Sequence, residues 1–351
     1  MQMENFTRFK EYNFVDFMKF FFMLCVIAIH SHVENIFGRY GWYITHCIFR
    51  LAVPFFFVAS GFFFKASLEK SGGAVQTLKK YIKRILIPFV FYVILNIFLD
   101  TFLKIINNYD FSTEWVLRQV QKILFDPPGA MWFLSACIFG ILFLYPFFKH
   151  RKLNTALSIG FFLYLFAMIC NTYFYVVKNN FFLANLIAIY VKFFKTARNG
   201  LFVGFFYLAL GIKCYEINKI RNIDKKKLWL AISALFIVLV IESFFAEKRK
   251  MFLLDDSSLF ISLPFLTVCI FLLSLQISYP KKDTKILRNL SSGMYFMHRF
   301  ILSVVSIGLV HLRPSYKDSS ALKFLLTTFV SFLICMIGYK IDNKKLNYLI
   351  K

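Results

Sequence analysis

Four ionisable side chains lie within the first apolar segment of the chain, where charge is costly. The segment from Asn13 to Glu34 is long enough to cross ~30 Å of hydrocarbon at ~1.5 Å per residue, yet it contains Asp16, Lys19, His30 and Glu34. At ~100° per residue on a helix, the four side chains fall within roughly 60° of one another. A cation in the middle of an isolated span costs at least ~2.5 kcal/mol. We therefore predict that this polar stripe faces the protein interior rather than lipid.

His30 is the candidate for proton transfer, because imidazole titrates near neutral pH and can take a proton from a hydroxyl group. A lone histidine in a span often only hydrogen-bonds a neighbouring carbonyl, but the charged groups on the same face favour a general base. Lys19 lies eleven residues earlier, about three turns or ~16 Å along this face. That spacing suits a ligand that extends through the membrane. His32 points from another face, and we predict a structural role for it.

Later groups of polar and aromatic residues have two interpretations each. The Ser60-Gly61 pair favours close helix packing. A basic cluster before the third apolar segment is either a topology anchor or a site for phosphate groups, and consists of Lys80, Lys83 and Arg84. Four candidate substrate contacts lie near the starts of later apolar segments: Trp132, Arg198, Tyr295 and His298. The simpler explanation for such residues is an aromatic side chain at the membrane interface or a helix cap.

Composition indicates a polytopic membrane protein. Of the 351 residues, 59% are hydrophobic and 49 are Phe, which is far more than a soluble domain tolerates. The formal net charge of +24 does not indicate nucleic acid, because the 42 Lys and Arg residues are spread through short loops between apolar segments. Anionic membrane lipid is the partner that this charge favours. The seven cysteines show no CxxC spacing and mostly lie in apolar segments, so we predict no metal site.

Hydropathy predicts one all-α polytopic domain over residues 1–351, with about ten transmembrane helices and no soluble appended domain. The predicted spans lie at about 14–35, 44–65, 84–106, 131–149, 153–177, 199–214, 227–245, 258–278, 290–311 and 321–340. Lys and Arg are more frequent in the alternate loops that place both termini in the cytoplasm. Two outer segments, 111–124 and 181–195, are predicted to be helices at the membrane surface.

The order of these groups resembles the integral-membrane acyltransferase type 3 family, which includes bacterial O-acetyltransferases of surface polysaccharides and peptidoglycan. The family's first-span pattern is Asp, two residues, Arg or Lys, ten residues, His, and it matches Asp16, Lys19 and His30. Its later motifs are similar to residues 54–62, to Lys80, Lys83, Arg84 and Pro88, to residues 132–134, and to Ser291, Tyr295 and His298. The stretches at 50–63 and 198–204 also resemble the membrane half of vancomycin-resistance serine racemases, where this fold is associated with amino-acid uptake.

The resemblance implies a multi-pass O-acyltransferase of the bacterial cytoplasmic membrane. Such an enzyme moves an acyl group, most simply from acetyl-CoA or another acyl-CoA, to a hydroxyl of an envelope glycan or lipid-linked sugar, alone or with a separate extracytoplasmic transferase. The roles it implies are coenzyme binding by Lys19, Lys80, Lys83 and Arg84, catalysis by His30 with Asp16, Lys19 and Glu34, and substrate contact by Trp132, Arg198, Tyr295 and His298. The alternatives are a carrier or exporter of a small polar solute such as an amino acid, and a membrane partner without activity.

The charge pattern yields a topology that can be tested directly. Single cysteines introduced near Lys226 into a cysteine-free variant should react only with reagents that reach the cytoplasm, and those near Asp255 only with reagents outside the cell. Accessibility measured on intact cells and on opened vesicles distinguishes the two sides. The reverse labelling pattern would exchange the predicted inner and outer faces.

Overall fold

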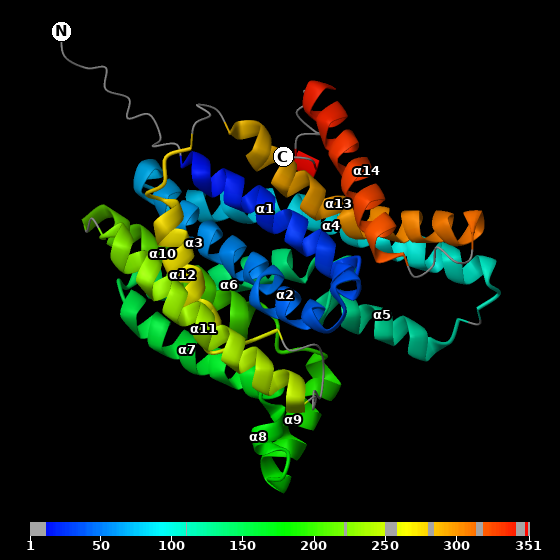
Figure 1. Cartoon of the computed structure of the whole chain (residues 1–351), viewed down its shortest axis with the longest axis horizontal. Helices are drawn as coiled ribbons and strands as arrows, with labels where there is room; N and C mark the ends of the chain where they lie inside the picture. Colours follow the sequence, from blue (N-terminus) through cyan, green and yellow to red (C-terminus); the bar gives the residue numbers. More distant parts are fainter. Residues whose placement is uncertain are drawn as a thin grey trace.

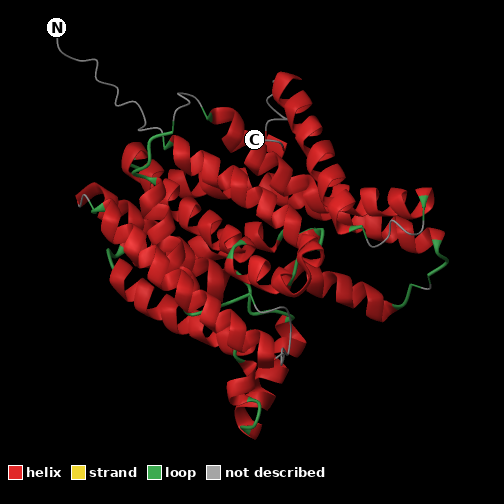
Figure 2. Cartoon of the chain, in the orientation of Figure 1, coloured by secondary structure: helices red, strands yellow, loops and turns green. Residues whose placement is uncertain are grey.

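The computed structural model describes residues 12–109, 111–220, 223–249, 258–279, 284–313, 319–341 and 348–349. Within these residues all regular structure is helical (Figure 2). The elements are α1 (Asn13–His30), η1 (Val33–Tyr40), α2 (Gly41–Cys47), η2 (Phe49–Leu51), α3 (Ala52–Ser71), α4 (Ala74–Ile106), α5 (Thr113–Phe125), α6 (Trp132–Lys149), α7 (Leu153–Cys170), α8 (Phe174–Val177), α9 (Phe181–Phe194), η3 (Gly200–Gly204), α10 (Phe205–Ile220), α11 (Lys225–Arg249), α12 (Ser262–Ser274), α13 (Lys285–Leu312) and α14 (Ser320–Ile341).

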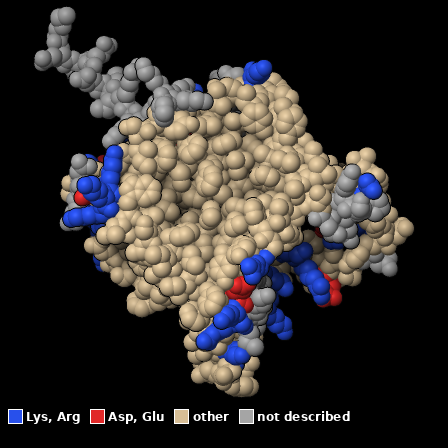
Figure 3. Space-filling model, in the orientation of Figure 1, with Lys and Arg blue, Asp and Glu red and all other residues tan. Residues whose placement is uncertain are grey.

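The described residues contain nine helical segments that are long and apolar enough to cross a membrane. The span predicted at 258–278 is formed by the shorter apolar helix α12, of 13 residues. Large apolar side chains such as Phe98 and Leu230 are exposed, and Figure 3 shows basic side chains at the margins of a broad uncharged face. The prediction of an all-α polytopic membrane protein is confirmed. Asp255 lies outside the described residues.

The second predicted span is divided into several helical pieces. A 3-10 turn, η2, separates α2 from α3, and Pro54 is the third residue of α3. Proline fits the first turn of a helix because its missing N–H has no partner there in any case. Pro54 therefore helps to start α3 after the break, inside the span predicted at 44–65.

The two predicted surface segments are helices and contact each other. Helix α5 begins after Ser112, whose Oγ accepts a hydrogen bond from the backbone N–H of Trp115 at 3.2 Å. From α5, Gln121 donates to the carbonyl oxygens of Lys192 and Phe193 at 3.0 and 2.8 Å. These carbonyls belong to the last turn of α9, which otherwise lacks intrahelical partners for them. The contact therefore caps α9 and joins it to α5.

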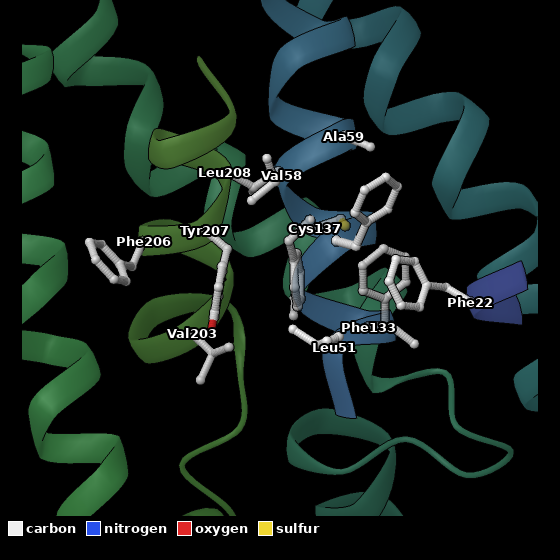
Figure 4. Packing of buried hydrophobic residues seen from close by; sticks show 14 of the residues in the cluster. Phe22, Leu51, Val58, Ala59, Phe133, Cys137, Val203, Phe206, Tyr207 and Leu208 are labelled. Atoms are coloured by element: carbon white, nitrogen blue, oxygen red, sulfur yellow. The ribbon is translucent and has the colours of Figure 1, made fainter. Parts of the chain in front are cut away.

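Helices α3 and α10 pack along each other in the buried core, where Val58 and Leu208 lie side by side (Figure 4). Two glycines allow this close approach. A Cβ atom on Gly61 would lie 2.2 Å from the carbonyl oxygen of Leu208, and one on Gly211 would lie 2.1 Å from the carbonyl oxygen of Val58. Small residues at such crossings let helix backbones approach in membranes. The packing role predicted for the Ser60-Gly61 pair is confirmed for its glycine.

Adding one methyl group at this crossing should destabilise the protein. Gly61→Ala and Gly211→Ala each force two backbones apart, so we expect a loss on the order of 1 to 3 kcal/mol and a lower melting temperature in detergent. Gly308→Ala in α13 is the control, because no heavy atom lies within 4 Å of the Cβ position there. Equal melting temperatures for all three variants would contradict this account of the core.

Candidate functional site

The site is built on α1, which packs against α13 and α3 in the middle of the bundle (Figure 1). Near the start of α1, Asp16 is buried and its Oδ2 accepts a hydrogen bond from Thr284 Oγ1 at 3.0 Å. The same oxygen lies 3.7 Å from Nε of Arg288 on α13. We call this end of the bundle, on the predicted cytoplasmic side, the inner end. Asp16 therefore fixes the start of α13 beside the start of α1.

Lys19 lies beside this carboxylate at the inner end. Its Nζ is 3.9 Å from Asp16 Oδ1 and 4.3 Å from the centre of the Phe63 ring on α3. Arg84 and Arg288 are both close enough to interact electrostatically with Lys19. Two cations, Lys19 and Arg288, therefore lie beside this carboxylate, and a third, Arg84, lies near Lys19. This excess of positive charge suits an anionic ligand such as a phosphate group.

The basic residues predicted to bind phosphate groups at the inner end, Lys80, Lys83 and Arg84, are not equivalent. All of them are exposed on α4, but the buried face of this helix is marked by Tyr81 and Ile85. At ~100° per residue and measured in one direction around the helix, Arg84 lies about 60° from Tyr81, Lys80 about 100° and Lys83 about 160°. The structure thus brings Arg84 toward Lys19 and turns Lys83 away from the buried face of α4.

His30 ends α1, and its ring stacks on that of His298 from α13. The ring centroids are 5.3 Å apart and the planes differ by 29°. Arg50, Arg198 and Arg299 all lie close enough to interact electrostatically with His30. We call this place the outer end. It joins residues of the first, second and ninth predicted spans with Arg198, which lies directly before the sixth span.

The other three predicted substrate contacts lie near this pair of histidines. The guanidinium carbon of Arg198 lies 5.5 Å from the ring centre of Trp132, a cation–π contact. On α13, Tyr295 lies one turn before His298, with ring centroids 5.5 Å apart. The Tyr295 hydroxyl donates to the carbonyl oxygen of Ala130 at 2.9 Å, which ties α13 to the turn before α6.

Glu34 is placed differently from the prediction. Helix α1 ends at His30, and His32 adopts a left-handed backbone conformation with φ of 57°, so Glu34 belongs to the 3-10 helix η1. Its Oε1 lies 3.1 Å from Nδ1 of His32, the histidine predicted to be structural. The expectation that all four ionisable residues share one helix face is therefore wrong for Glu34, because the helix stops before reaching it.

Two residues near the outer end were not among the predicted site residues. Arg50 belongs to η2 and Arg299 follows His298 in α13. The available signal was their position inside apolar segments, where an arginine is costly and usually functional. Among the described residues, no three His, Cys, Asp or Glu side chains are grouped so that they could hold a metal ion.

Comparison with known protein families identifies the chain's relatives. A family model described as an acyltransferase domain matches residues 12–340. The chain belongs to this acyltransferase family. The match includes both the inner and the outer end of the site. No solved structure is similar enough to match.

Curated relatives of this acyltransferase-family chain carry racemase names. It is 25% identical over 336 residues to an amino-acid racemase of Enterococcus faecalis, covering 95% of this chain and 46% of that protein. It is 25% identical over 292 residues to a serine/alanine racemase of Enterococcus gallinarum, covering 80% of this chain and 39% of that protein. The chain therefore spans less than half the length of the curated relatives it matches.

Proposed function

We propose that this protein moves an acyl group, in the simplest case acetyl, from acyl-CoA to a hydroxyl group of a cell-envelope glycan or lipid-linked sugar. The observation that carries the proposal is that polar groups gather at both ends of α1. Cations gather at its inner end around Lys19, and two imidazoles meet at its outer end around His30. Membership of the acyltransferase family supports the same chemistry. We place the reaction in the bacterial cytoplasmic membrane.

The two ends serve different parts of the reaction. At the inner end, Lys19 and Arg84 bind the phosphate groups of coenzyme A, and Asp16 orients Lys19. The pantetheine arm then extends along α1 and carries the thioester toward His30. This route uses the ~16 Å that separate Lys19 from His30 on one helix. Trp132 and Arg198 contact the acceptor at the outer end.

His30 handles the proton that the transfer releases. The acceptor hydroxyl oxygen attacks the thioester carbonyl carbon while the imidazole of His30 takes the hydroxyl proton. The carbon–sulfur bond then breaks, and the proton passes to the departing coenzyme A thiolate. An ester and free coenzyme A are formed, and the imidazole returns to its neutral form.

The placement of the α4 cations predicts which of them binds the donor. Arg84→Ala removes a guanidinium beside Lys19, so acetyl-CoA affinity should fall by about tenfold, the effect of losing one charge-assisted hydrogen bond. Lys83→Ala is the matched control, because this exposed side chain on the same helix turn points away from the buried face marked by Tyr81. Binding of radiolabelled acetyl-CoA to purified protein measures both. Equal affinities in the two variants would argue that the α4 cations only set topology.

Removing the proposed base should abolish transfer while leaving donor binding intact. We expect His30→Ala to reduce acyl transfer by roughly 10² to 10⁴-fold. His30→Gln should be nearly as inactive, because an amide forms hydrogen bonds but cannot take a proton near neutral pH. The measurement is transfer of label from [¹⁴C]acetyl-CoA into membranes of cells that express each variant. His32→Ala, with an exposed side chain at the same end, is the control. A folded His30→Gln protein with full transfer would rule out His30 as the base.

A further inference from the structure

The histidine that stacks on His30 is itself an unusual group for a protein interior. His298 has no exposed surface and lies on α13, directly before Arg299. Its Nδ1 is 2.6 Å from the carbonyl oxygen of Tyr295. A carbonyl oxygen only accepts hydrogen bonds, so Nδ1 carries the hydrogen. In the neutral ring Nε2 then holds a lone pair and can only accept.

This accepting atom has no partner among the described residues. Nε2 of His298 is buried and makes no hydrogen bond. Leaving a buried acceptor unsatisfied is costly, so a group that donates a hydrogen bond is needed there. His46 also has a buried ring nitrogen without a hydrogen bond, but its ring stacks on Trp42, with the ring centroids 3.8 Å apart, and not on a candidate catalytic residue. His298 instead stacks on the proposed base.

We propose that Nε2 of His298 accepts a hydrogen bond from the bound substrate, so that the site uses two histidines rather than one. This inference rests on the proposed function. The substrate offers two donors of the same chemistry: the hydroxyl of the acceptor, and the amide N–H of coenzyme A nearest to the thioester. Either group reaches the outer end only when its substrate is bound beside His30. Contact with the hydroxyl makes His298 a second catalytic residue, and contact with the amide makes it a residue that positions the thioester.

His298→Asn separates this role from a structural one. The Asn side-chain amide nitrogen can keep the hydrogen bond from the Nδ1 position to the Tyr295 carbonyl, but the lone pair at Nε2 is lost. The control is His311→Asn on the same helix, because His311 Nδ1 lies 2.9 Å from the Ile307 carbonyl oxygen and its side chain is exposed. Melting temperature in detergent checks that both variants fold.

Two measurements distinguish the sources of the hydrogen bond. If the amide of coenzyme A is the donor, affinity of purified His298→Asn protein for acetyl-CoA should fall by about tenfold. If the acceptor hydroxyl is the donor, acetyl-CoA affinity should be unchanged, and transfer of label from [¹⁴C]acetyl-CoA into expressing membranes should fall by roughly 10²-fold or more. Wild-type binding and wild-type transfer by a folded His298→Asn protein would overturn the inference. Absence of both activities in the wild-type protein would instead overturn the proposed function.

Discussion

The parallel pairing of α1 with α13 is the constraint on which the site depends. At the inner end, one buried carboxylate, Asp16, contacts both Thr284 and Arg288. At the outer end, His30 and His298 stack. A membrane offers no hydrophobic force between helices, so polar contacts and close packing must hold such a pair together. Because both contacts join the same two helices, a shift of α13 along α1 would disturb the two ends together.

The rest of the bundle holds this pair in place from the side. Helix α3 contacts α1 and α10, and glycines at its crossing with α10 remove the freedom to slide. Through Phe63, α3 also covers Lys19 with an aromatic ring, which favours the cation over the ring face and limits its contact with lipid. Glu242 of α11 accepts hydrogen bonds from the backbone N–H groups of Ile261 and Ser262 at 3.0 Å and so caps the short helix α12. Each of these contacts helps to hold neighbouring helices together where the hydrophobic effect does not.

The sequence predicts the transmembrane helices better than the contacts between them. Long apolar segments must be helical in a membrane, because every backbone group needs an internal partner, and this argument recovers the spans and the polar face of α1. It also extends α1 too far, since no sequence signal marks the left-handed residue His32 that redirects the chain before Glu34. The contact of His30 with His298 joins positions 268 residues apart, and hydropathy carries no information about such pairing. The family resemblance named both histidines but did not say that they meet.

The separation of the two ends bears on the nature of the ligand. A small solute such as an amino acid, moving through the protein, meets the cations near Lys19 and the imidazoles near His30 only one after the other. An elongated ligand occupies both at once, and the two ends of α1 then contribute to binding one molecule. Asp16 bears on this choice. Its buried carboxylate at the inner end holds the neighbouring cations in place, although its negative charge also offsets part of their positive charge. A path that only attracts and releases small solutes has little need for such fixed cations. In the function proposed above, cations, an apolar stretch and an imidazole follow one another along α1 in the order of phosphates, pantetheine arm and thioester in an acyl-CoA molecule.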